Sequence, residues 1–173
     1  MIPLDDLNFK EKLKNIKAFV FDVDGVLSGS VVHICNDGEL ERTTNVKDGY
    51  AIKKALEADF AVGIITGGKS QAVKARFENL GVDSFYLASE NKIEDFNDFL
   101  KKKKLKASSV LYMGDDIPDM EVMKQCGVAT CPADADEQIK AISLYISQKE
   151  GGKACVRDII VQVMRTQNKW FVK

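Results

Sequence analysis

The feature that most constrains the fold is a series of short apolar runs that end in acids, glycine or threonine. The first run, residues 18–21, leads into Asp22-Val23-Asp24-Gly25, and the runs at 61–65 and 110–113 end at Thr66-Gly67 and Gly114-Asp115-Asp116. Helical patterns separate these runs, and this alternation is typical of a parallel sheet with helices packed against it. The sequence therefore predicts an α/β, Rossmann-like fold whose mainly parallel strands bring these polar residues to one edge of the sheet.

The other elements follow from the same patterns. Further short strands are expected at 85–87 and 128–130, and helices at 47–58, 70–80, 93–103, 120–125 and 154–167. Asn36-Asp37-Gly38 lies between two strand-like runs, which predicts a hairpin. The 173 residues contain no long linker, so we expect one domain over residues 1–173, with a hairpin flap at 31–44 and a C-terminal helix and tail at 151–173.

Composition excludes several classes of protein. Lys and Arg number 25 against 26 Asp and Glu, so no basic excess points to nucleic acid. No apolar run approaches the roughly 20 residues that cross a bilayer, which predicts no membrane partner. The first residues include Asp5 and Asp6 where a signal peptide carries positive charge, and the four cysteines form no CxxC pair. We therefore expect a cytoplasmic protein with reduced thiols.

The acidic strand ends predict a metal site and a nucleophile. Carboxylates gathered at one sheet edge repel one another, and Mg²⁺ with oxygen ligands relieves the repulsion. The single histidine, His33, falls in the hairpin, which argues against Ser-His and Cys-His schemes. An aspartate nucleophile acting on a phosphoryl group remains, and Asp22 and Asp24 can divide nucleophilic and acid–base work. Thr66 offers a hydroxyl, and Lys92 or another lysine offers positive charge.

At these positions the chain resembles the haloacid dehalogenase (HAD) superfamily of phosphohydrolases. The resemblance rests on four elements in order, namely residues 21–27, residues 65–67, Lys92 and residues 114–119. It implies that Asp22 is the nucleophile and Asp24 the general acid and base, while Thr66 and Lys92 hold the phosphate. A receiver domain uses similar residues, but its acidic pair comes first and its phosphorylated aspartate stands alone on a later strand, which is not the order here.

The same resemblance implies a Mg²⁺ site formed by Asp22, Asp24, Asp115 and Asp116. Asp22 and Asp115 would bind through their carboxylates and Asp24 through its backbone carbonyl. Asp116, together with Asp119, would support the metal from behind these ligands or through water.

The spacing of the motifs leaves no room for the cap domain that many HAD phosphatases carry. Only residues 25–65 and 67–91, segments of 41 and 25 residues, separate Asp24, Thr66 and Lys92. A capless enzyme must accept a large substrate or borrow a lid from another subunit.

Along nearly its whole length the chain is similar to the 3-deoxy-D-manno-octulosonate 8-phosphate phosphatases, a capless homotetrameric HAD family. These enzymes remove phosphate from an eight-carbon sugar acid in lipopolysaccharide biosynthesis. The similarity is carried by residues 22–28, 45–50, Arg76, 91–92, 151–152 and Arg157. It implies that the substrate-binding residues are Asp24, Asn45, Val46, Lys47, Asp48, Gly49, Lys53, Gly67, Arg76 and Lys92. It also implies a homotetramer in which hairpin 31–44 covers a neighbouring site.

Two departures from this family fall on the substrate side. Gly68 stands where the family carries arginine, and Lys153-Ala154-Cys155 alters its glycine-rich stretch after Gly151-Gly152. A nine-carbon, sialic-acid-type ulosonate 9-phosphate therefore stays open as substrate, although relatives of that kind carry an acid at position 68. A non-catalytic HAD module is the third hypothesis, and the retained acidic cluster argues against it because such a cluster costs stability without its metal. The apolar tail Trp170-Phe171-Val172 is expected to pack at a subunit interface near an adjacent active site.

Overall fold

A six-stranded parallel sheet forms the centre of the computed structural model, which describes residues 8–170. The strand order is β5-β4-β1-β6-β7-β8, and every neighbouring pair is parallel. The strands are β1 (Ala18–Phe21), β4 (Ala61–Ile65), β5 (Ser84–Tyr86), β6 (Val110–Met113), β7 (Val128–Cys131) and β8 (Tyr145–Ile146). The predicted α/β class is confirmed. The two-residue strand β8 was not predicted, because so short a segment carries no readable alternation.

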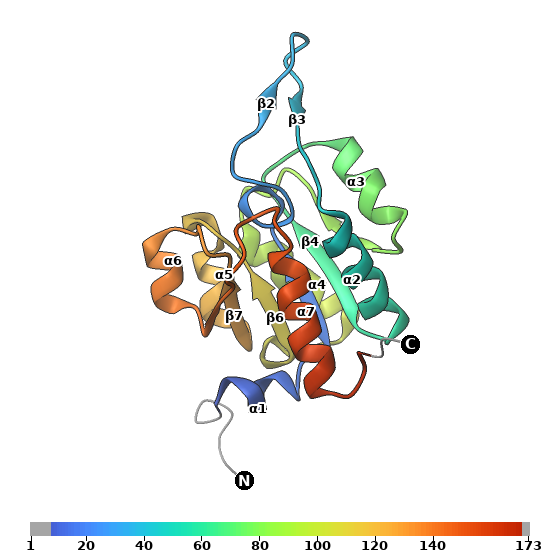
Figure 1. Ribbon diagram of the computed structural model, residues 1–173, viewed down its shortest axis with the longest axis vertical. Helices are drawn as coiled ribbons and strands as arrows, with labels where there is room; N and C mark the ends of the chain where they lie inside the picture. Colours follow the sequence, from blue (N-terminus) through green and yellow to red (C-terminus); the bar gives the residue numbers. More distant parts are fainter. Residues whose placement is uncertain (1–7, 171–173) are drawn as a thin grey trace.

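Helices cover both faces of the sheet (Figure 1). One face carries α1 (Phe9–Leu13), α2 (Val46–Glu57), α3 (Gln71–Glu78) and α7 (Cys155–Thr166). The other face carries α4 (Lys92–Lys103), α5 (Met120–Gln125) and α6 (Glu137–Ile142). Strand β1 alternates between the two cores, with Phe19 and Phe21 on the α7 side and Val20 on the α4 side. Burial on both faces explains why β1 reads as a continuous apolar run.

Side-chain caps fix where the helices at the site begin. Asn45 Oδ1 accepts from the backbone N–H of Lys47 at 2.9 Å at the start of α2. Ser70 Oγ accepts from the backbone N–H of Val73 at 3.3 Å at the start of α3. Asn and Ser are preferred at this position because their oxygens satisfy N–H groups that the helix itself leaves free.

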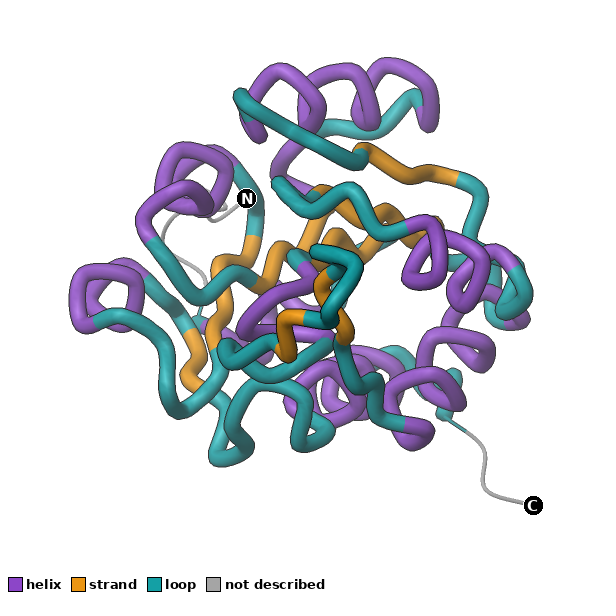
Figure 2. The backbone as a smooth tube through the Cα atoms, turned by 90° about the horizontal axis from the view of Figure 1, so that it is seen from above, coloured by secondary structure: helices purple, strands orange, loops and turns teal. Residues whose placement is uncertain are grey.

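The predicted hairpin projects from the carboxyl edge of the sheet (Figures 1 and 2). Its strands β2 (His33–Ile34) and β3 (Leu40–Glu41) are antiparallel, and Gly38 at the tip has a φ of +84°. Val31 and Ile34 are 83% and 78% exposed. Residues 8–170 contain no cap domain beyond this hairpin. Within the same range, no helix has both the length and the apolar character needed to traverse a bilayer.

Trp170 packs against its own chain. Its ring lies edge-on to Tyr50 of α2 at 6.2 Å between centroids, and the guanidinium of Arg157 lies 5.7 Å from both rings. Phe171 and Val172, the rest of the predicted interface tail, lie outside the described residues.

Candidate active site

The loop after β1 carries the predicted nucleophile in a single tight turn. Asp22 Oδ1 accepts from the backbone N–H of Val23 at 2.7 Å, and the Ser28 N–H donates to the carbonyl of Val23 at 2.8 Å. Gly25 has a φ of +84°, and a side chain there would collide with the carboxylate of Asp115. Glycine therefore allows this loop to pass against the end of β6.

A buried ion network lies behind the nucleophile. Lys92 Nζ, from the first residue of α4, lies 2.9 Å from Asp22 Oδ2 and 2.7 Å from Asp119 Oδ1. Asp119 also accepts from the Tyr112 hydroxyl at 2.6 Å and from the Asp115 N–H at 3.1 Å. Burial acts to lower the pKa of Lys92, but the charges of Asp22 and Asp119 outweigh it and raise that pKa. Lys92 therefore stays protonated, fixed and able to hold an anion.

The acids at this edge fit a divalent cation. Asp22, Asp115 and Asp119 each offer an oxygen, and these oxygens lie within 4.8 Å of one another. Burial, reinforced by the charge of Asp119, raises the pKa of Asp22 to about 7. Burial and the charge of Asp22 raise that of Asp115 to about 8. Asp115 Oδ1 is buried without a hydrogen-bond partner. An all-oxygen donor set with one unsatisfied buried oxygen suits Mg²⁺.

The predicted acid–base residue lies at the mouth of the site. Asp24 is partly exposed, and its Oδ1 accepts from Ser28 Oγ at 3.2 Å. Thr66 is buried at the end of β4, where its Oγ1 accepts from the Gly68 N–H at 3.1 Å. Arg42, from the stem of the hairpin, donates to both carboxylate oxygens of Asp24, from Nε at 2.6 Å and from Nη2 at 2.9 Å. The role of Arg42 was not predicted, because this residue belongs to no motif and follows a strand of two residues.

Two predicted substrate ligands hold α2 against the segment before α7. Asn45 caps α2 with its oxygen and donates from Nδ2 to the carbonyl of Gly152 at 3.0 Å. Asp48 Oδ1 accepts from the Arg157 N–H at 2.6 Å, while its Oδ2 is buried without a partner. Burial raises the pKa of Asp48 to about 6. Asp48 therefore contributes first of all to the packing of α2 and α7.

The remaining predicted substrate ligands lie on α2, on α3 or just after β4. Arg76, in the last turn of α3, lies against Gly49, where an added Cβ would be 2.8 Å from Arg76 Nη2. The other positions are exposed, namely Val46, Lys47, Lys53 and Gly67. The roles of these residues in substrate binding stay predictions.

The acids Asp116 and Asp119, both expected to support the metal, lie in different surroundings. Asp116 is exposed, and its Oδ1 accepts from the Ile117 N–H at 2.8 Å, outside the group of three convergent carboxylates. Asp119 is fully buried inside that group. The Tyr112 hydroxyl that fixes Asp119 was missed, because within an apolar run a tyrosine reads as core.

Comparison with known proteins identifies the family. The model of the haloacid dehalogenase-like hydrolases matches residues 30–133, more than half of the chain. The chain belongs to this family. This HAD-like hydrolase is also 37% identical over 158 residues to 3-deoxy-D-manno-octulosonate 8-phosphate phosphatase KdsC of Escherichia coli K12. That alignment covers 91% of this chain and 84% of the E. coli enzyme.

Solved structures place this HAD-like hydrolase in the same group. It superposes with a TM-score of 0.90 and 31% identity on 3-deoxy-D-manno-octulosonate 8-phosphate phosphatase from Yersinia pestis, covering 92% of this chain and 86% of that one. The Moraxella catarrhalis phosphatase of the same name, in complex with a magnesium ion, a phosphate ion and KDO, gives a TM-score of 0.89 and 30% identity. Coverage is 92% of this chain and 91% of that one.

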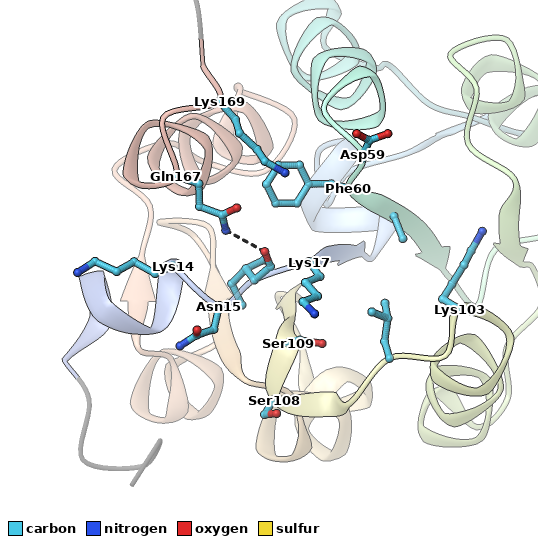
Figure 3. A pocket seen from close by; sticks show the side chains of 13 residues that line it. Lys14, Asn15, Lys17, Asp59, Phe60, Lys103, Ser108, Ser109, Gln167 and Lys169 are labelled. Atoms are coloured by element: carbon cyan, nitrogen blue, oxygen red, sulfur yellow. Dashed lines mark hydrogen bonds between the residues drawn. The ribbon is translucent and has the colours of Figure 1, made fainter. Parts of the chain in front are cut away.

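The HAD-like hydrolase also has a cavity of about 700 Å³ at the opposite, amino edge of the sheet (Figure 3). It lies where β1 and β4 begin, and four lysines and Asp59 are among its lining residues. Gln167 closes one wall by donating to the carbonyls of Leu13 and Ile16, both at 2.8 Å. The cavity contains none of the predicted catalytic residues, so its size does not mark the active site.

Proposed function

We propose that this HAD-like hydrolase is a Mg²⁺-dependent phosphatase of 3-deoxy-D-manno-octulosonate 8-phosphate, acting in lipopolysaccharide biosynthesis through an aspartyl-phosphate intermediate. The observation that carries the proposal is the convergence of Asp22, Lys92, Asp115 and Asp119 at one buried edge. The similarity of the whole chain to enzymes named for this reaction supports the choice of substrate.

Hydrogen bonds fix the orientation of the Asp22 carboxylate, the proposed nucleophile. The Val23 N–H and Lys92 Nζ hold the two oxygens of Asp22 at 2.7 Å and 2.9 Å, so the carboxylate approaches the phosphorus atom in one orientation. Asp22, Asp115 and the backbone carbonyl of Asp24 would hold Mg²⁺, which would supply positive charge to the phosphoryl group. Lys92 and the Thr66 hydroxyl bind those oxygens from the protein side.

Asp24 handles the protons. It donates one to the leaving sugar oxygen while Asp22 takes the phosphoryl group. It then removes a proton from the water that hydrolyses the aspartyl phosphate, which releases inorganic phosphate and restores both aspartates.

We propose further that the enzyme is a cytoplasmic homotetramer whose hairpin 31–44 covers a neighbouring site. The exposure of Val31 and Ile34, together with that of Leu40 opposite Ile34, supports an interface there, because a group of exposed apolar side chains on one hairpin is stabilised by burial. The four free thiols support a reducing compartment.

The experiment is phosphate release with Mg²⁺, using the eight-carbon and nine-carbon ulosonate phosphates beside simple hexose phosphates. A large kcat/KM preference for the eight-carbon acid is expected. Preference for the nine-carbon acid would keep the mechanism and change the substrate. Equally low turnover of all these phosphate esters would favour the hypothesis of a non-catalytic HAD module.

A further inference from the structure

Arg42 is the least expected side chain at the active site. It follows β3 in the hairpin stem, yet its side chain is only 6% exposed. Its Nε and Nη2 engage the two oxygens of Asp24, and its Nη1 donates to the carbonyl of Leu40 at 2.9 Å. All three nitrogens are thus in use, which fixes the plane of the guanidinium.

Gly68 borders the space that this guanidinium occupies. A Cβ at position 68 would lie 3.4 Å from Arg42 Nη2, 3.4 Å from Thr66 Oγ1 and 3.7 Å from Asp24 Oδ2. Arg42, Thr66 and Gly68 also line one small hollow. The cation therefore lies among the groups that receive the substrate, and a long side chain at position 68 would displace it.

This contact conflicts with the role of Asp24. Both carboxylate oxygens are engaged by Arg42, and Oδ1 also accepts from Ser28. An oxygen of Asp24 must be released before it can face a leaving group. A two-pronged guanidinium contact is given up most readily to another planar anion, and a carboxylate matches it in shape and charge.

We propose that Arg42 is a specificity residue that exchanges its contact with Asp24 for the carboxylate of the substrate. The exchange binds the sugar acid and frees Asp24 in the same event. A phosphate ester that lacks a carboxylate leaves Asp24 held by Arg42 and is turned over poorly. This inference rests on the proposed function, because it requires a substrate with both a phosphate and a carboxylate.

The test compares two esters in the wild type and in Arg42→Ala, with Mg²⁺ present. The eight-carbon ulosonate 8-phosphate carries the carboxylate, and arabinose 5-phosphate does not. In Arg42→Ala we expect kcat/KM for the acid to fall by about 10- to 100-fold, the loss of one charge-assisted contact. Turnover of arabinose 5-phosphate should fall far less or rise, so the preference for the acid shrinks by at least about 10-fold.

Further variants separate specificity from simple support of the hairpin. Arg42→Lys should recover only part of the preference, because an ammonium cannot make the two-pronged contact. Arg42→Ala combined with Gly68→Arg should restore the preference for the sugar acid, since the new side chain at position 68 supplies a guanidinium to the same hollow. Arg165→Ala, an exposed arginine in the last turn of α7, is the control.

Each failure can be told apart. Equal losses on both esters, or an unchanged preference, would overturn the role of Arg42. If the wild type itself hydrolyses arabinose 5-phosphate but not the sugar acid phosphate, the proposed substrate is wrong.

Discussion

The phosphate side and the substrate side of the catalytic edge are built differently. On the phosphate side, Asp22, Lys92 and Asp119 are 7%, 8% and 0% exposed and hold one another in a closed network. On the substrate side, Val46 is 74% exposed, and Lys53 also faces solvent. The groups proposed to carry out the reaction are therefore buried and cannot move independently of one another. Some of the predicted substrate-binding side chains, such as Val46 and Lys53, can be exchanged without disturbing the core.

The largest expected effect comes from removing the nucleophile on the phosphate side. Asp22→Asn should lower kcat by roughly 10⁴-fold or more, because no neighbouring group replaces the attacking oxygen. Thermal unfolding should stay close to wild type, since the amide keeps the shape of the side chain. Phosphate release measures the effect, with Glu57→Gln at the far end of α2 as control. Normal turnover in Asp22→Asn would remove it from the chemistry.

A second prediction contrasts two acids three residues apart. Asp119→Ala leaves the Lys92 charge and the Tyr112 hydroxyl short of a buried partner, and should cost about 3–5 kcal/mol of unfolding free energy. Asp116→Ala removes an exposed cap and should cost about 1 kcal/mol. Urea unfolding of the two variants measures the difference. Similar losses would contradict the view that Asp119, and not Asp116, belongs to the buried network.

The pH dependence of the metal-free protein should reveal the same network. Asp22 and Asp115 have pKa values raised from 3.8 to about 7 and about 8, so the folded state binds their protons more tightly than the unfolded state. Stability of the metal-free protein therefore falls as pH rises from about 4 to about 8. The gain in Tm on adding Mg²⁺ should be larger at about pH 8.5 than at about pH 6, where the cation must displace protons. In Asp115→Asn the gain in Tm on adding Mg²⁺ should be small at both pH values. An undiminished gain in this variant would exclude Asp115 as a metal ligand.

The smallest effect is expected on the substrate side. Arg76→Ala should raise KM by about 10-fold and leave kcat within about 3-fold, because it removes a contact that is the same in the bound substrate and the transition state. Steady-state kinetics with the sugar acid phosphate measure the split. Lys74→Ala on the same helix, which removes an exposed pair with Glu78, is the matched control. Unchanged kinetics in Arg76→Ala would exclude Arg76 as a substrate-binding residue.

The sequence predicts which groups converge on the phosphate side but does not predict the contact of Arg42 with Asp24, and the reason is physical. Asp22, Thr66 and Asp115 each follow a buried apolar strand, so the register of a parallel sheet brings them together without further information. The contact of Arg42 with Asp24 depends instead on the angle at which a hairpin leaves the sheet. No periodicity encodes that angle.

Other misses have the same origin. Strand β8 and helix α6 span two and six residues, too few for a periodic signal. Asp116 and Asp119 are the same residue type in the same motif, and only the backbone turn after β6 decides which of them is buried. The contact of Asp48 with the start of α7 was also missed, because it joins residues more than a hundred positions apart. The role of Asp48 as a substrate ligand stays a prediction.

The contacts of Gly152 with Val26 and Asn45 have a consequence for the chain during its synthesis. Gly152 donates to the carbonyl of Val26, and its own carbonyl accepts from Asn45. The loop of the nucleophile is therefore completed by residues that the ribosome adds more than a hundred positions later. During synthesis the first two-thirds of the polypeptide already contains Asp22, Thr66, Lys92 and Asp115, yet it lacks Gly152 and its contacts with the loop after β1. A product truncated before Gly152 would therefore carry all the predicted catalytic residues but lack both of these hydrogen bonds.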